Sequence, residues 1–125
     1  MIDPDIAILV VDDSSSARRI VRYYLKNMGY GACFEAENGR DALKVLENEK
    51  IDLIISDLAM PIMDGMDLLV TVRQHSVYGA IPFIILTANN EQDTLVKAVA
   101  AKVNHYIIKP FTAETLEEKV RAVLP

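Results

Sequence analysis

Short apolar runs alternate with amphipathic segments along the whole chain, and this alternation constrains the fold more than any other feature. Continuous apolar runs predict strands that are buried on both faces of a sheet. The predicted strands are residues 6–11, 32–36, 51–56, 83–86 and 106–108. Five strands in strict alternation with five helices predict an α/β fold, in which helices cover both faces of a parallel sheet.

The segments between the predicted strands carry apolar residues at helical spacing, together with signals for where a helix starts and ends. The serines at 14–16 can cap the first helix, and Gly29 is placed to end it. Further helices are predicted around residues 42–46, 66–74 and 92–101, and after a cap at Thr112. No linker, internal repeat or low-complexity stretch interrupts the pattern, so we expect residues 1–125 to form one domain.

The composition fits a globular domain and argues against several classes of protein. Of 125 residues, 51% are hydrophobic and 25% are charged, which is enough apolar material for a core. No apolar run approaches the roughly 20 residues of a membrane-spanning helix, and the N-terminus lacks the pattern of a signal peptide. A net charge of −5 without a basic cluster argues against nucleic-acid binding. The lone cysteine, Cys33, fits a reducing cytoplasm, and we expect a cytoplasmic monomer that contacts no membrane.

Polar and charged side chains stand where four of the apolar runs end. Asp12 and Asp13 follow the first run, Asp57 follows the third, Thr87 ends the fourth and Lys109 follows the fifth. In an open parallel sheet, ligands bind beyond the carboxyl ends of the strands. We therefore expect these side chains, although far apart in the chain, to converge on one crevice.

The chemistry of this cluster points to a divalent cation and a phosphoryl group. Three neighbouring carboxylates repel one another, so at neutral pH they favour a bound cation or raised pKa values. Oxygen ligands in a wet cleft suit Mg²⁺, and one such ion together with Lys109 balances the charge of the three aspartates. A carboxylate can act as a nucleophile and form an aspartyl-phosphate, while the cation, Lys109 and the Thr87 hydroxyl position the phosphoryl group.

Four motifs, in order along essentially the whole chain, resemble those of a known family. They are Asp12-Asp13, Asp57 followed by Met60-Pro61-x-Met63-Asp64-Gly65, Thr87-Ala88, and Lys109-Pro110-Phe111. Together they resemble the receiver domain of two-component response regulators, and most of all its single-domain, CheY-like chemotaxis regulators. The resemblance implies a flavodoxin-like sheet with the strand order 2-1-3-4-5.

The resemblance implies a role for each residue of the cluster. Asp57 is expected to accept a phosphoryl group from a histidine kinase or a phosphotransfer protein. The expected ligands of Mg²⁺ are Asp12, Asp13, Asp57 and the backbone carbonyl of Ala59. Lys109 is expected to bind a phosphoryl oxygen and to precede Pro110 through a cis peptide bond.

The resemblance also implies a switch. Thr87 is expected to hydrogen-bond another phosphoryl oxygen and move inward, and Tyr106 is expected to follow by changing its rotamer. This change alters the face formed by the fourth helix, the fifth strand and the fifth helix, where a downstream protein target is expected to bind. The chain is then a signalling switch rather than an enzyme, and it catalyses only its own phosphorylation and dephosphorylation.

Three positions depart from the usual pattern of the family. Ala59 and Asn89 stand two residues after Asp57 and Thr87, where side chains in the family modulate access of the hydrolytic water. We expect Ala59 to leave the site open. Lys102 stands in place of a glycine that is common before the fifth strand, so it is expected at positive φ.

Charged residues outside the motifs receive simpler interpretations. Arg18, Arg19 and Arg22 are expected on a solvated helix face, with a contact to a kinase or phosphotransfer partner as the second interpretation. His75 and His105 have no partner motif, and we expect both to be surface histidines rather than ligands or bases.

Three other functions share parts of the pattern. The chain can be the receiver of a hybrid histidine kinase or of a multidomain regulator. A Mg²⁺-dependent aspartyl phosphatase of the haloacid-dehalogenase type places a second aspartate where this chain has Ala59, and needs a substrate cap that 125 residues cannot supply. In a flavodoxin-like cofactor carrier, Asp12 and Asp13 would repel the phosphate of the flavin.

Overall fold

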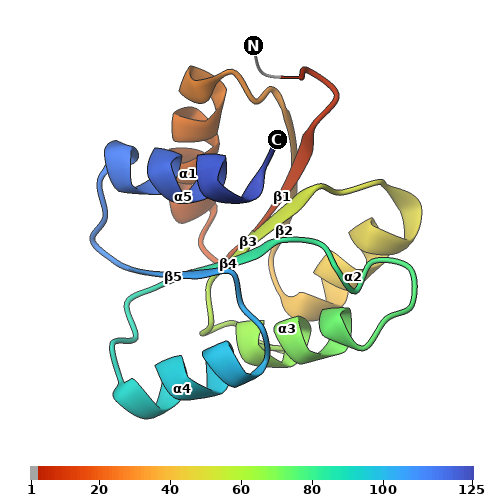
Figure 1. Ribbon diagram of the computed structural model, residues 1–125, viewed down its shortest axis with the longest axis vertical. Coiled ribbons are helices and arrows are strands. Elements are labelled where there is room, and N and C mark those ends of the chain that lie inside the picture. The colour runs from red at the N-terminus through yellow and green to blue at the C-terminus, as the bar shows by residue number, and fades with distance from the viewer. Residues whose placement is uncertain (1–2) are drawn as a thin grey trace.

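The computed structural model describes residues 3–125, and in it a parallel sheet lies between two layers of helices (Figure 1). Within these residues five strands pair in the order β2-β1-β3-β4-β5, which confirms the predicted fold and strand order. The strands are β1 (Ala7–Val11), β2 (Ala32–Ala36), β3 (Leu53–Ser56), β4 (Phe83–Thr87) and β5 (His105–Ile108). The helices are α1 (Ser15–Met28), α2 (Gly39–Asn48), α3 (Gly65–Arg73), α4 (Gln92–Ala100) and α5 (Ala113–Val123). No helix in this part of the chain is long and apolar enough to cross a membrane.

Two hydrophobic cores lie on the two faces of the sheet, and alternate residues of each strand supply them. In β1, Ile8 and Val10 belong to the core shared with α1 and α5, whereas Leu9 and Val11 belong to the core shared with α2, α3 and α4. Figure 1 shows the first pair of helices above the sheet and the other three below it. Because both faces are covered, β1, β3 and β4 are buried along their whole length, which is why their sequences are continuous apolar runs.

The predicted strands agree with the observed ones to within two residues at each end. The largest shift is in β3, which begins at Leu53 rather than at residue 51. The N–H of Asp52 donates to the carbonyl oxygen of Ala7 at 2.8 Å, and the carboxylate of Asp52 accepts from the N–H of Ala7 at 2.9 Å. At the start of the hydrogen-bond ladder between β1 and β3, the Asp52 carboxylate therefore takes the place of a backbone carbonyl as acceptor.

Side-chain caps explain where most of the helices begin. The capping side chains are Ser14 for α1, Asn38 for α2, Asp64 for α3 and Thr112 for α5, each of which accepts from a backbone N–H three residues later. Helix α4 differs, because Glu91 at its N-cap makes no side-chain cap bond. Within α4 only Ala98 is fully buried. Helix α4 is therefore held less firmly at its N-terminal end than its neighbours.

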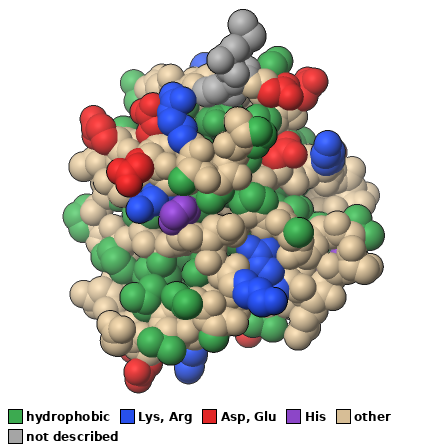
Figure 2. Space-filling view, in the orientation of Figure 1, with side chains coloured by type: hydrophobic (Ala, Val, Ile, Leu, Met, Phe, Trp, Pro, Cys, Tyr) green, Lys and Arg blue, Asp and Glu red, His purple; other side chains and the backbone are tan. Residues whose placement is uncertain are grey.

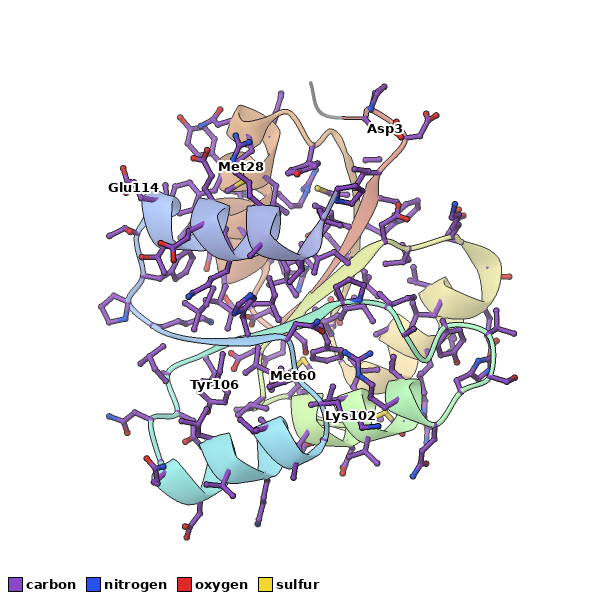
Figure 3. All side chains as sticks on the ribbon, viewed as in Figure 1. Asp3, Met28, Met60, Lys102, Tyr106 and Glu114 are labelled. Carbon is purple, nitrogen blue, oxygen red and sulfur yellow. The ribbon has the colours of Figure 1, made fainter. Side chains whose placement is uncertain are left out.

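The C-terminal end of α4 is held by a single side chain from α3. Arg73, the last residue of α3, donates hydrogen bonds to the carbonyl oxygens of Lys102 (3.1 Å), Gly79 (3.0 Å) and Ile81 (2.6 Å), and to Oδ1 of Asn104 (2.9 Å). Lys102, which lies just beyond the end of α4 (Figure 3), has a φ of 68°, so its expected left-handed conformation is confirmed. Burial lowers the pKa of the Arg73 guanidinium, which nevertheless stays charged. Arg73 thus ties α3, the loop before β4 and the turn before β5 together.

Replacing Arg73 by methionine removes these hydrogen bonds and keeps most of the apolar length of the side chain. We expect the free energy of unfolding to fall by about 1–3 kcal/mol, because backbone and amide acceptors lose a charged donor. Urea denaturation followed by circular dichroism measures the change. The control is Arg40→Met at an exposed position of α2, which should change stability by less than about 0.5 kcal/mol. Equal losses in the two variants would contradict the role of Arg73.

Candidate phosphoacceptor site

The site lies at the carboxyl ends of the strands, and the ladder hydrogen bonds continue past the strands to position it. The N–H of Asp57 donates to the carbonyl oxygen of Val11 at 2.9 Å, so Asp57 stands beside Asp12. The N–H of Lys109 donates to the carbonyl oxygen of Thr87 at 2.8 Å, which places the lysine beside the end of β4. The expected convergence of these residues follows from the parallel register of β1, β3, β4 and β5.

One cation connects two of the carboxylates. The ammonium Nζ of Lys109 lies 3.1 Å from Oδ2 of Asp12 and 3.3 Å from Oδ2 of Asp57. The side chains of Asp12 and Asp57 are only 9% and 14% exposed, so solvent screens these ion pairs weakly. Burial alone lowers the pKa of Lys109, but the hydrogen bonds and charges of Asp12 and Asp57 outweigh burial and raise it. Lys109 is therefore a firmly charged group at the centre of the site.

Backbone donors orient the second oxygen of each carboxylate. Oδ1 of Asp12 accepts from the N–H of Ser14 at 2.9 Å, and Oδ1 of Asp57 accepts from the N–H of Leu58 at 2.6 Å. Each aspartate therefore directs its Oδ2 toward Lys109. In Asp57, the oxygen without a backbone hydrogen bond is therefore Oδ2, which faces the Lys109 ammonium.

Arg18 supports the site in a way that the sequence did not indicate. The expectation of a solvated face is wrong for Arg18, which is 9% exposed, whereas Arg19 and Arg22 are exposed as expected. The guanidinium of Arg18 donates to the carbonyl oxygen of Asp12 at 2.6 Å and to the carboxylate of Glu35 at 2.8 Å. Glu35 lies on β2, and only the pairing of β1 with β2 brings it to α1. A contact between such distant segments has no signal in the sequence.

The oxygen donors of the site are suited to Mg²⁺, although they do not form a complete coordination shell. In residues 3–125 no three His, Cys, Asp or Glu side chains are arranged as a ready-made metal cluster, and Asp13 and Ala59 are exposed. The donors are carboxylate oxygens and a backbone carbonyl, which Mg²⁺ binds together with water. Lys109 neutralises only one of the three aspartates, so the site keeps a demand for positive charge. The residues present therefore fit a hard divalent cation.

The two residues expected to form a switch meet at the backbone of Asn89. The hydroxyl of Tyr106 donates to the carbonyl oxygen of Asn89 at 2.8 Å, and Oγ1 of Thr87 accepts from the N–H of Asn89 at 3.3 Å. Figure 3 shows Tyr106 between β5 and the segment that leads into α4. Burial and the charges of Asp57 and Glu91 raise the pKa of Tyr106, so its hydroxyl remains a donor at neutral pH. Sequence analysis missed this use of Asn89, for which the Thr-Ala-Asn turn after β4 is the only signal.

The loop that follows Asp57 is shaped by close backbone contacts. The N–H of Gly65 donates to the carbonyl oxygen of Leu58 at 2.9 Å, and a Cβ at position 65 would collide with the carbonyl oxygen of Asp57. Ile62 has a φ of 71°, which is unusual for a β-branched residue and which the sequence did not predict. The loop lines a groove of about 400 Å³ between the starts of α3 and α4, to which Ala59 and Asn89 contribute.

The fold and this cluster define a class of protein. Residues 8–121 match the family described as the response regulator receiver domain, and the chain belongs to this family. The members are regulators of two-component signalling that carry a phosphoacceptor, rather than a classical family of enzymes.

Among individual members, the chain is similar to regulators of chemotaxis. It is 38% identical to the chemotaxis protein CheY-3 of Vibrio cholerae over 120 residues, which cover 96% of this chain and 92% of that protein. It is 39% identical to the chemotaxis protein CheY of Pseudomonas aeruginosa over 116 residues, which cover 93% of this chain and 94% of that protein. These likenesses confirm the resemblance to CheY-like receivers.

Solved structures give the same result. The chemotaxis protein CheY4 of Vibrio cholerae superposes with a TM-score of 0.87 at 35% identity, covering 95% of this chain and 99% of that one. The signal receiver domain of a signal transduction histidine kinase from Syntrophus aciditrophicus also has a TM-score of 0.87, at 31% identity, covering 94% and 89%. The fold is thus shared by a chemotaxis protein and by the receiver domain of a histidine kinase.

The ion pairs of Lys109 predict a specific pH dependence. Because its folded-state pKa is raised above the ordinary value of 10.5, the contribution of Lys109 to stability is fully present below that pH and is lost as pH rises through the folded-state pKa. We expect Lys109→Met to lower the free energy of unfolding by similar amounts at about pH 7 and about pH 9, and by less above about pH 11. Urea denaturation of both proteins at each pH measures the difference. The control is Lys50→Met at an exposed position, which should change the free energy of unfolding only slightly and equally at each pH.

Proposed function

We propose that this chain is a phosphorylation-dependent signalling switch in which Asp57 accepts a phosphoryl group from the histidine of a kinase or phosphotransfer protein. The observation that carries the proposal is the position of Asp57 Oδ2, which lies 3.3 Å from the Lys109 ammonium at the carboxyl end of β3. The named relatives support an output in chemotaxis. We further propose that the chain acts as a single receiver domain, as a monomer, in the cytoplasm.

In the proposed reaction, Oδ2 of Asp57 attacks the phosphorus atom and the phosphorus–nitrogen bond of the donor histidine breaks. The donor imidazole leaves with the electron pair of that bond, and Asp57 becomes an aspartyl-phosphate. Lys109 pairs with an oxygen of the transferred group, and Asp12 keeps its backbone contact with Ser14. Asp12, Asp13, Asp57 and the carbonyl of Ala59 would hold a Mg²⁺ ion, which would neutralise part of the charge on the phosphoryl oxygens.

The proposed switch runs from Thr87 to the surface around α4. When the Thr87 hydroxyl binds a phosphoryl oxygen, the segment at Asn89 moves, and the hydrogen bond from Tyr106 to Asn89 moves with it. Helix α4 can follow because its N-terminal end has no side-chain cap. Figure 2 shows hydrophobic side chains gathered over β5 and α4, where Val96, Val99 and Ile108 are 56%, 62% and 40% exposed. We propose this face as the binding site of a downstream protein target.

Of two alternative functions, the structural comparisons support one, and the residue at position 59 argues against the other. A receiver within a larger kinase or regulator keeps the same chemistry, and the likeness to the Syntrophus aciditrophicus histidine-kinase receiver favours it as the second candidate. An aspartyl phosphatase needs a second aspartate at position 59, and the exposed Ala59 supplies neither an acid nor a base there.

The proposal predicts a labile phosphoryl adduct on Asp57. Intact-protein mass spectrometry after incubation with acetyl phosphate should detect one added phosphoryl group with Mg²⁺, and none with EDTA or in Asp57→Asn. Asp67→Asn, an exposed acidic position in α3, is the matched control and should be phosphorylated like the wild type. An adduct that survives in Asp57→Asn would place the phosphoacceptor elsewhere, and no adduct under any condition would refute the proposed chemistry.

The small side chain of Ala59 predicts an open path for the hydrolytic water. Ala59 is exposed and lines the groove beside Asp57, so a longer polar side chain there should obstruct the water. We expect Ala59→Asn to lengthen the lifetime of the aspartyl-phosphate about three-fold or more, as a change of roughly 0.7 kcal/mol in the barrier requires. Loss of the adduct is followed by mass after the acetyl phosphate is removed. Ala80→Asn, exposed in the loop before β4, is the control, and equal lifetimes in all three proteins would refute the expectation.

A further inference from the structure

A basic surface lies on α1 next to the edge of the sheet that β2 forms. Arg19, Arg22, Tyr23 and Lys26 are exposed and, at spacings of three and four residues, they share one side of α1. We call these four residues the α1 basic surface. They line a cavity of about 340 Å³ together with Tyr30, Gly31 and Cys33. The expected solvated face of Arg19 and Arg22 is thus extended in the structure by Tyr23 and Lys26.

The charge of this surface is opposite to that of the whole chain, which has a net charge of −5. Glu35 on β2 is shared by two arginines, at 2.8 Å from Nε of Arg18 and 3.0 Å from Nη1 of Arg22. Within residues 3–125, no carboxylate lies at ion-pairing distance from Arg19 or Lys26. The α1 basic surface therefore presents positive charge that the fold does not neutralise.

An exposed aromatic ring stands among these cations. Tyr23 is 62% exposed, and its ring lies 6.1 Å from the ring of Tyr24. Tyr24 in turn packs edge-on against Phe111 at 5.9 Å, which limits the freedom of the pair. Exposed tyrosine and arginine are residue types that dominate the energetics of protein interfaces.

We propose that the α1 basic surface is a docking site for an acidic segment of a protein partner. Carboxylates of the segment pair with Arg19 and Lys26, and an apolar side chain of the segment packs against Tyr23. A short acidic segment is small enough to contact the α1 basic surface alone. A DNA duplex or an anionic bilayer extends beyond it and meets the net negative charge of the remaining chain. Charge complementarity thus selects an acidic peptide over the larger polyanions.

The site is separate from the phosphoacceptor and from the proposed output face. Strands β2 and β5 form opposite edges of the sheet, so a partner on the β2 side leaves the surface around α4 and β5 free. Two partners can therefore bind at once. The docking site does not depend on the chemistry of Asp57, and the two proposals can fail independently.

The test uses the full chain and two short peptides as probes. The acidic probe is acetyl-Glu-Glu-Phe-Glu-Glu-amide, and the neutral probe has glutamine in place of each glutamate. Titration at low salt is followed by the amide chemical shifts of the protein. The test variant is Arg19→Gln with Lys26→Gln, and the matched control is Arg40→Gln with Lys50→Gln, which removes the same charge from exposed positions elsewhere. Both variants are also incubated with acetyl phosphate.

We expect the acidic probe to shift resonances of α1 and of residues 30–33, and the neutral probe to leave them unchanged. The test variant should bind about ten-fold more weakly than the control, since each lost ion pair accounts for roughly a three-fold change. Equal weakening in both variants, binding of both peptides alike, or shifts confined to other surfaces would overturn the proposal. Binding of a DNA duplex or of anionic phospholipid vesicles in preference to the acidic probe would overturn it as well. Unchanged phosphorylation of the test variant is expected and would separate docking from phosphoacceptor chemistry.

Discussion

The contact of the Lys109 ammonium with both Asp12 and Asp57 is the interaction on which the site depends. Two carboxylates that are largely buried at the ends of adjacent strands repel each other, and leaving them without a cation costs several kcal/mol. The ammonium Nζ of Lys109 lies 3.1 Å from Asp12 and 3.3 Å from Asp57, and its positive charge offsets this repulsion. It neutralises only part of their charge once Asp13 is included. The chemistry of the site therefore fits one further cation.

The two ends of α4 are held differently. Arg73 holds the C-terminal end of α4, whereas the N-terminal end has no side-chain cap and lies next to Asn89. In the proposed switch, a change at Thr87 or Tyr106 reaches the N-terminal end of α4 through Asn89. On the other face of the sheet, α1 is anchored by Arg18, which bonds to Asp12 and Glu35.

The expectation from the sequence was wrong where side chains meet across distant segments. It placed Arg18 in solvent, although this residue is bonded to Asp12 and to Glu35 on a neighbouring strand. Packing of α1 against the sheet decides which of the three neighbouring arginines turns inward, and helical spacing alone does not.

The sequence by itself determined the strands, the parallel sheet and the residues that gather at its carboxyl edge. These follow from local rules, because a strand buried on both faces must be apolar and its end must carry the polar group that meets a ligand. The left-handed backbone at Lys102 followed from the family resemblance, because a glycine is common at this position before β5. Tertiary structure alone decided that Lys109 contacts Asp12 and Asp57, that Asn89 connects Thr87 with Tyr106, and that Arg73 holds α4. Each of these contacts depends on distances between segments that only the register of the strands and the packing of the helices establish.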